Sequence, residues 1–165
     1  MFEEITGIPA HPLLVHAPVV FVPLLVLLTL AYAFVPSVRS HTRLVLGLLA
    51  VATPISALFA KLSGDAFFER LESRDRISQQ YYPRLEEHGD LGTVTLYTTI
   101  VLAVLALALV VLVAPKSAAA ADRPSGAARV LPLVLGVLSL VAGAVSLYYV
   151  IRTGDTGAHA VWDGA

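Results

Sequence analysis

The amino-acid sequence predicts an all-α integral membrane protein, a four-helix bundle that crosses the lipid bilayer four times. Only 14% of its 165 residues are charged, against about a quarter in a typical soluble domain. The charge is missing from four long apolar runs, none of which contains Asp, Glu, Lys or Arg. These runs are residues 13–35, 44–60, 91–113 and 130–151. They predict a single transmembrane domain over residues 1–165 that has the lipid bilayer as its partner.

The length and polarity of the runs favour helices. About twenty helical residues cross a hydrocarbon core of roughly 30 Å, so the run 44–60 is at the short end of the range. Backbone amides in lipid must be satisfied within the segment, and no run alternates in polarity as a transmembrane strand would. Pro18, Pro23 and Pro54 lack an amide donor and are expected to bend the first two spans.

The fourth run contains small residues at intervals of three and four. Gly136, Ser139, Gly143 and Ser146 follow this spacing. Small residues allow two helices to approach closely in a membrane, so this face is expected to pack against a neighbouring span.

The connections between the runs predict the orientation of the protein. An even number of spans places both termini and the connection 61–90 on one side, and the connections 36–43 and 114–129 on the other. The two short connections have the higher density of Lys and Arg. By the positive-inside rule they are cytoplasmic, and the termini are extracytoplasmic. Within the last connection, residues 117–128 are typical of a flexible linker.

The connection 61–90 contains apolar residues at roughly helical spacing among charged ones. They are Phe67, Phe68, Leu71, Ile77, Tyr81 and Leu85. This pattern predicts an amphipathic helix lying in the membrane interface between the second and third spans. The alternative is a helical hairpin that packs back on the bundle.

Several function classes are disfavoured by the composition. A net charge of −1 with no basic face argues against a nucleic-acid partner, and the absence of cysteine excludes thiol catalysis and thiolate clusters within the chain. The spans contain no ionisable group near their middle, which disfavours ion pumping. No nucleophile elbow, zinc-protease pair or phosphate-binding loop is present. The chain is therefore not expected to be an enzyme by itself.

The histidines are the residues best suited to chemistry. Four of the five fall on the side of the termini, whereas His41 lies on the other side. The four are His11, His16, His88 and His159. Imidazoles brought from distant parts of the sequence to one membrane face predict a haem or metal site. We expect His16 and His88 to be the first ligands and His11 the next.

Other residues on the same side are expected to support this site. They are His159, Asp65, Glu87 and Asp155. Two imidazoles from different helices suit a six-coordinate haem, and three with a carboxylate suit a divalent metal. His11 and His16 are five residues apart, about 140° around a helix, so they do not share a face.

A structural reading of the same residues remains open. Under it the chain is a non-catalytic membrane scaffold or accessory subunit, alone or as a homo-oligomer, and its histidines and acids form a hydrogen-bonded cap.

The glycine-rich segment 152–157 is interpreted as the end of the last helix, with Gly154 in the left-handed conformation.

The segment His11-Pro12-Leu13-Leu14-Val15-His16-Ala17-Pro18 resembles the His-Pro-x-x-Val-His-x-Pro signature of family 2231 of the domains of unknown function, small bacterial proteins with four expected spans. The family tends to have a histidine just before the third span, the position of His88. Many members read Arg-x-Thr-Gly-His-x-Gly-Gly after the last span, and Asp155 stands here in place of that histidine. The resemblance implies a bacterial inner-membrane location. Fusion of some relatives to Rieske-type domains implies a redox or respiratory partner.

Overall fold

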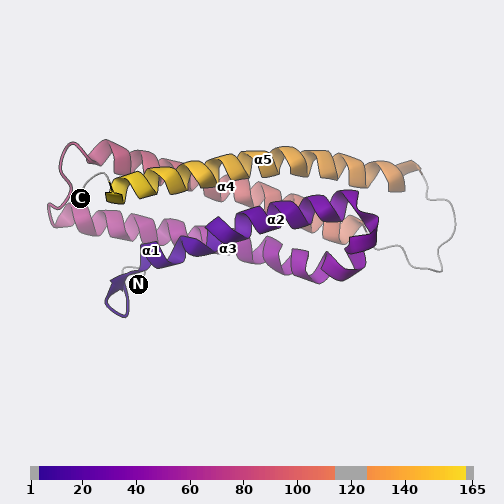
Figure 1. The fold of residues 1–165 in the computed structure, drawn as a ribbon, viewed down its shortest axis with the longest axis horizontal. Helices are drawn as coiled ribbons and strands as arrows, with labels where there is room; N and C mark the ends of the chain where they lie inside the picture. Colours follow the sequence, from indigo (N-terminus) through magenta and orange to yellow (C-terminus); the bar gives the residue numbers. More distant parts are fainter. Residues whose placement is uncertain (1–3, 114–125, 163–165) are drawn as a thin grey trace.

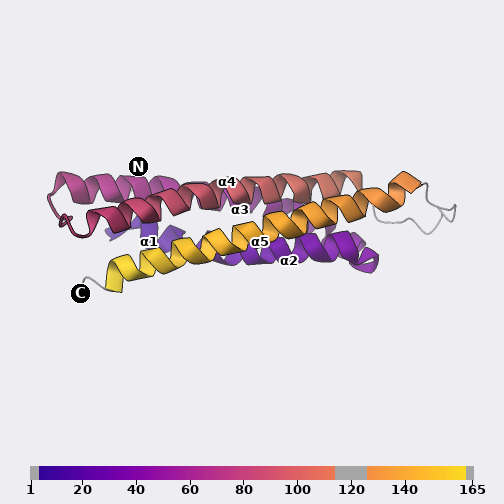
Figure 2. The same ribbon diagram turned by 90° about the horizontal axis from the view of Figure 1, so that it is seen from above.

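Four long apolar helical segments pack together in the computed structural model of the chain, which describes residues 4–113 and 126–162. Each is long and apolar enough to cross a membrane, and Figures 1 and 2 show them lying side by side. The segments are Ala10–Phe34, Pro36–Ser73, Tyr82–Leu112 and Val130–Trp162. The prediction of four packed apolar helices is therefore confirmed.

The elements follow one another along the chain in a simple order. They are β1 (Glu4–Ile5), β2 (Ile8–Pro9), α1 (Ala10–Leu14), α2 (His16–Phe34), the 3₁₀ turn η1 (Pro36–Val38), α3 (Arg39–Ser73), α4 (Tyr82–Leu112) and α5 (Gly126–Trp162). Both ends of the described chain lie at the same end of the bundle as the α3–α4 turn (Figure 1). We call this the mouth end: the start of α1, the end of α3, the start of α4 and the end of α5.

The first long helical segment consists of two helices in line. The break falls at Val15 because Pro18 has no amide hydrogen to donate to the carbonyl of Leu14. The amide of Val15 still donates to the His11 carbonyl over 3.1 Å, so the two helices remain aligned. Pro23 and Pro54, in contrast, lie inside α2 and α3 without interrupting them.

No separate interfacial helix lies between the second and third spans, so that prediction is wrong. Residues 61–73 continue α3, residues 82–90 begin α4, and a turn over residues 74–81 joins the two helices. Phe68 of this stretch packs against the partner helix, since its ring meets that of Tyr82 edge to face with centroids 5.4 Å apart. The pattern serves helix–helix packing, which corresponds to the alternative of a helical hairpin.

The last helix does not end at the glycines of 152–157. α5 continues to Trp162, and Gly154 lies inside it, so the expected left-handed cap is absent there. A glycine inside a helix costs about 1 kcal/mol relative to alanine, which packing against a neighbour can outweigh. At its other end α5 begins at Gly126. Residues 117–125 of the expected linker lie outside the described part of the chain.

The small-residue face of α5 packs against α2, as its spacing predicts. A β-carbon at Gly136 would stand 2.7 Å from Cζ of Phe34, and one at Gly143 would stand 3.0 Å from Cγ1 of Val26. Ser139 is fully buried, as is Ser146. This face therefore sets how closely the two helices approach.

A buried arginine closes the end of the bundle opposite the mouth end. Arg39 donates from Nε to the carbonyl of Tyr32 over 2.8 Å and from Nη2 to the carbonyl of Ala33 over 2.7 Å. These carbonyls belong to the last turn of α2, where no helical amide is left to satisfy them. The hydroxyl of Tyr32 donates in turn to the Val113 carbonyl over 2.8 Å, which ties α2 to the end of α4.

A short antiparallel hairpin precedes α1 at the mouth end. Thr6 and Gly7 form its turn with φ values of 52° and 83°, the left-handed combination that two-residue hairpins favour. Glu4 forms an ion pair with Arg70 of α3. The hairpin is thereby attached to the projecting part of that helix.

Candidate functional site

His11, in the first turn of α1, packs its ring against α3. Its Nδ1 lies 3.0 Å from the carbonyl oxygen of Ala60 and 3.3 Å from Oγ of Ser63. A carbonyl oxygen can only accept, so Nδ1 is the donor and the neutral ring keeps a lone pair on Nε2. Gly64 provides the space for the ring, since a β-carbon there would stand 3.0 Å from its Cε1.

His88, in the second turn of α4, packs against α5 in the same manner. Its Nδ1 lies 3.1 Å from Oγ1 of Thr156. The Thr156 hydroxyl has one hydrogen, which it donates to the backbone carbonyls of Arg152 and Thr153, each 3.1 Å away. It therefore accepts from His88, whose lone pair is again on Nε2. A β-carbon at Gly157 would stand 2.8 Å from Cε1 of this ring.

The two imidazoles are direct neighbours, and we call them the histidine pair. Their ring centroids are 5.9 Å apart and their planes are 77° from parallel. Each ring is half-buried. The pair therefore links α1 and α3 on one side of the mouth end to α4 and α5 on the other.

The surroundings of the histidine pair favour neutral rings. Both lie beyond the charge-free runs, at the level of the charged residues of the mouth end. Burial lowers the pKa of His11, opposed by its hydrogen bond to Ala60 and by the carboxylate of Asp65. Burial also lowers the pKa of His88, and the nearby His11 adds to this, opposed by a hydrogen bond to the Thr153 backbone.

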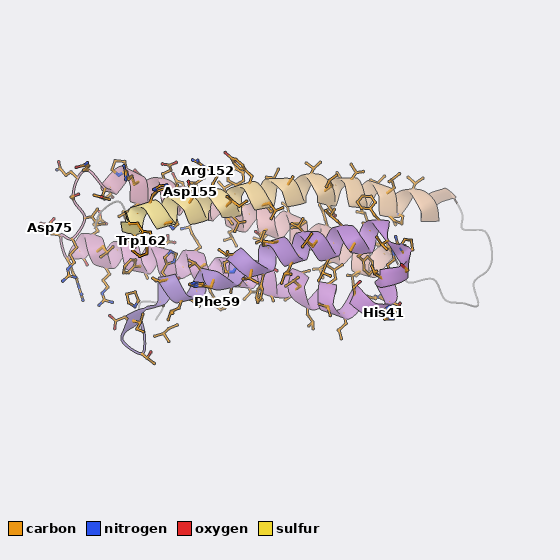
Figure 3. All side chains as sticks on the ribbon, in the orientation of Figure 1. His41, Phe59, Asp75, Arg152, Asp155 and Trp162 are labelled. Atoms are coloured by element: carbon orange, nitrogen blue, oxygen red, sulfur yellow. The ribbon has the colours of Figure 1, made fainter. Side chains whose placement is uncertain are left out.

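The other predicted histidines lie apart from this pair. The side chain of His16 is exposed, on a different face of the helix from His11, as their spacing predicts. His159 is exposed near the end of α5 and lies 3.5 Å from a carboxylate oxygen of Asp155. Figure 3 places His41 at the opposite end of the bundle from Asp155.

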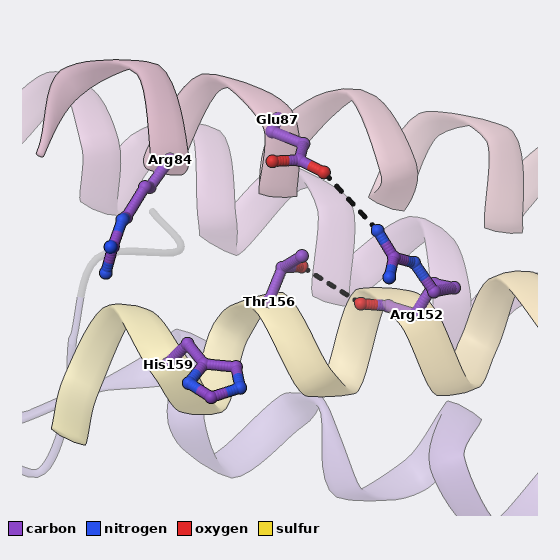
Figure 4. A pocket seen from close by; sticks show the side chains of 5 residues that line it. All are labelled: Arg84, Glu87, Arg152, Thr156 and His159. Carbon is purple, nitrogen blue, oxygen red and sulfur yellow. Dashed lines mark hydrogen bonds and ion pairs between the residues drawn. The ribbon is translucent and has the colours of Figure 1, made fainter. Parts of the chain in front are cut away.

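Two of the three predicted supporting acids already have cationic partners. Asp65 lies 2.6 Å from the ammonium group of Lys61, one helical turn away. Glu87 lies 3.5 Å from the guanidinium group of Arg152 (Figure 4). Across residues 4–113 and 126–162, no three His, Asp or Glu side chains come together in a way that could hold a metal ion.

The partners of the histidine pair were not predicted from the sequence. In α3 and in α5 a hydroxyl residue is followed directly by glycine: Ser63-Gly64 serves His11, and Thr156-Gly157 serves His88. The hydroxyl meets Nδ1 and the glycine leaves room for the ring. Ser63-Gly64 beyond the second apolar run and Thr156-Gly157 beyond the fourth were the available signal, although Thr153-Gly154 has the same pattern and makes room for neither ring.

Comparison with known proteins gives one match. None of the curated proteins matches the chain. None of the solved structures does so either. Residues 7–165 match a family described as "Predicted membrane protein (DUF2231)", which covers all four apolar helices and both rings of the histidine pair. The chain is therefore a multi-pass membrane protein of the DUF2231 family.

Proposed function

We propose that the histidine pair binds a transition-metal ion at the mouth end of this membrane protein. One observation carries the proposal: both Nδ1 atoms donate to protein oxygens, which leaves the lone pairs of both Nε2 atoms for a ligand. Histidine ligands in metal sites commonly donate their second nitrogen to a carbonyl or hydroxyl, which fixes the tautomer and the ring orientation.

The chemistry of the pair suits borderline metals. Imidazole nitrogen is a good ligand for zinc, copper, nickel and iron. Only the neutral ring can ligate, and the lowered pKa of both His11 and His88 keeps both rings neutral at pH 7. With two protein ligands, the remaining coordination positions belong to water or to a molecule from outside. Such an open site suits exchange or sensing of the ion more than permanent storage.

A single ion suits the geometry better than haem does. Haem iron also takes two axial imidazoles, so the donor set alone fits both. The rings of His11 and His88 are in direct edge-to-face contact, with centroids 5.9 Å apart. Binding of haem would require the two rings, and the helices that hold them, to separate far enough for the porphyrin to fit between them. Binding of one ion would require only a local rotation of the two rings. Binding by His16 with His88, the first expectation from the sequence, stays a separate hypothesis.

We also propose the cellular setting that the sequence favours. The protein would lie in a bacterial inner membrane with the mouth end on the extracytoplasmic side, because the connections at the other end are richer in Lys and Arg per residue. It would act with a redox or respiratory protein if the ion is copper or iron. A homo-oligomer is compatible with this setting, and no catalytic activity of the chain alone is needed.

A structural cap is the competing function, and one observation favours it. Two of the three supporting acids already have cationic partners, in the Asp65–Lys61 and Glu87–Arg152 pairs. In that case His11 and His88 would serve only to join the helices against which they pack.

The proposal is tested with the protein purified in mild detergent. Bound metals are counted by mass spectrometry, zinc, copper and nickel binding is titrated after chelation, and a visible spectrum reports haem. The informative variants are His11→Asn and His88→Asn, because an asparagine amide can replace the Nδ1–H donor but offers nothing in place of Nε2. His16→Asn and His41→Asn are matched controls at exposed histidines.

Metal binding is expected in the wild type and in both controls, and its loss is expected in either variant of the pair with little change in melting temperature. A Soret band that is lost in both His11→Asn and His88→Asn would show that the ligand of the pair is haem and not a single metal ion. If the wild type binds neither, and the two asparagine variants melt normally while His11→Ala does not, the cap is the function. Loss of binding in His16→Asn alone would restore the first hypothesis.

A further inference from the structure

The donor set of the histidine pair is small and uncharged. Both Nδ1 atoms donate to protein oxygens, so each ring offers one neutral nitrogen, Nε2, to an ion. The hydroxyls beside the rings are already occupied: Ser63 donates to the Ala60 carbonyl over 2.9 Å, and Thr156 donates to carbonyls of its own helix. An ion bound here would therefore gain two imidazole nitrogens as its ligands.

No carboxylate is free to join the two rings. Asp65 is the acid that acts on His11 electrostatically, and the ammonium group of Lys61 lies 2.6 Å from each of its carboxylate oxygens. The Lys61 side chain is itself packed against α4, where a β-carbon at Gly92 would stand 3.9 Å from its Cδ. Within the described ranges 4–113 and 126–162, no further acid or histidine completes a three-ligand site. The pair would therefore add no negative charge to a bound cation.

These limits favour a monovalent ion over a divalent one. Zinc usually takes four ligands, and divalent nickel and copper prefer square or tetragonal arrangements. The cost of taking an ion out of water rises steeply with its charge, and two neutral imidazoles offset little of that cost. Cu(I) has a single charge and a filled d shell, and it forms stable two-coordinate complexes with nitrogen ligands.

The separation of the two rings suits collinear bonds to one ion. Two imidazoles with metal–nitrogen distances of about 2 Å place their centroids about 6 Å apart when the bonds are collinear, and about 5 Å apart at the tetrahedral angle. The centroids of His11 and His88 are 5.9 Å apart. A linear ion therefore requires only that the rings turn toward each other, whereas a tetrahedral ion requires that they also approach. The ring planes can stay crossed, because turning a ring about a collinear bond changes no metal–nitrogen distance.

We infer that the histidine pair selects monovalent copper, Cu(I), as a two-coordinate ion between the Nε2 atoms of His11 and His88. This inference rests on the proposed function and names the ion that the site takes. The chain has no cysteine and a single methionine, Met1, so the thiolates and thioethers that favour Cu(I) most strongly are nearly absent. Two imidazoles alone give a site that can pass the ion on to a stronger one.

The test uses the whole protein in mild detergent after chelation. Cu(I) is titrated anaerobically with ascorbate against bicinchoninate, a coloured chelator that competes for it. Ag(I) is a second monovalent probe with a filled d shell, and zinc and nickel are titrated in parallel. X-ray absorption at the copper edge counts the ligands in the loaded wild type.

Three kinds of variant separate the possible ligands. His11→Asn and His88→Asn remove the Nε2 donors of the pair, and His16→Asn is the control at an exposed histidine. Lys61→Gln/Asp65→Asn removes the nearest carboxylate together with its partner, so the net charge of the protein stays the same.

We expect one Cu(I) per chain, bound at least tenfold more tightly than zinc or nickel, with two nitrogen ligands. Binding of Cu(I) and Ag(I) should be lost in both variants of the pair and kept in His16→Asn and in Lys61→Gln/Asp65→Asn. Zinc binding that is equally tight and needs the same two histidines would overturn the choice of Cu(I) but leave the metal site standing. Three or more ligands in the absorption spectrum would do the same. If no ion binds through the pair, the proposed function fails together with the inference.

Discussion

The ring of His88 lies directly against the backbone of Gly157, at a distance that leaves no room for a β-carbon. Gly157→Ala should therefore push the ring out of line and weaken metal binding by the histidine pair at least tenfold. Isothermal titration with zinc after chelation measures this change.

Gly154→Ala is the matched control, because it lies in the same helix and a β-carbon there meets nothing within 4 Å. It should leave metal binding unchanged and stabilise α5 by about 1 kcal/mol through helix propensity. If both variants bind metal like the wild type, the contact with Gly157 does not position His88.

The histidine pair should make the stability of the protein depend on pH. The pKa of each ring is lowered in the folded state from its ordinary value of about 6.5, so the unfolded chain binds more protons below that pH. The contribution of the pair to the free energy of unfolding is therefore fully present above about pH 6.5. It is lost as the pH drops from there toward the folded-state pKa values. Thermal unfolding in detergent between pH 7.5 and pH 5 measures this loss.

The variant His11→Asn/His88→Asn should flatten that part of the profile, since neither position then titrates. His16→Asn/His41→Asn is the control and should keep the wild-type slope. A slope that survives in the first double variant would show that other groups are responsible for it.

Arg39→Ala should destabilise the end of the bundle opposite the mouth end. It would leave the carbonyls of Tyr32 and Ala33 without their charged donor, at a cost of about 2 kcal/mol. Arg43→Ala removes the same charge from an exposed side chain nearby and should have little effect. Circular dichroism during heating compares the two, and equal melting temperatures would contradict the capping role of Arg39.

The orientation can be tested because the chain has no cysteine of its own. Ser78→Cys places a thiol in the exposed α3–α4 turn, and Ser37→Cys places one in η1 at the opposite end. A membrane-impermeant maleimide should label the first on intact spheroplasts and the second only after permeabilisation. The reverse result would invert the proposed orientation.

The sequence predicted the four helices well because a lipid environment permits few backbone conformations. A long run without charge must satisfy its own backbone hydrogen bonds, and only a helix does so within one segment. The continuation of α3 to Ser73 was harder to see, because an amphipathic pattern fits a lipid surface and a partner helix equally well. Gly154 misled for a related reason: its local preference for ending a helix is outweighed by contacts of α5 with α4, such as the bond between Thr156 and His88.

The candidate site was predicted in part. The spacing of His11 and His16 showed that only one of them could face a given neighbour, but the rotation of the helix decides which one. That rotation depends on packing against α3, where Gly64 admits the ring of His11. The residues around His11 in the sequence cannot predict this contact, because Gly64 lies more than fifty positions later in the chain.

The unequal ends of the bundle determine how it meets membranes of different thickness. At one end, α2 passes to α3 through a three-residue turn, which leaves little helix outside the bilayer. At the mouth end, α3 continues past Ala60 for about 20 Å, and α5 past Ile151 for about 16 Å, at about 1.5 Å per residue. A bilayer thicker by a few ångströms would reach only the first turn of each projection, where the long side chains of Lys61 and Arg152 can extend to the interface, and it would take the histidine pair deeper. The polarity around a bound ion would then report the local thickness of the membrane.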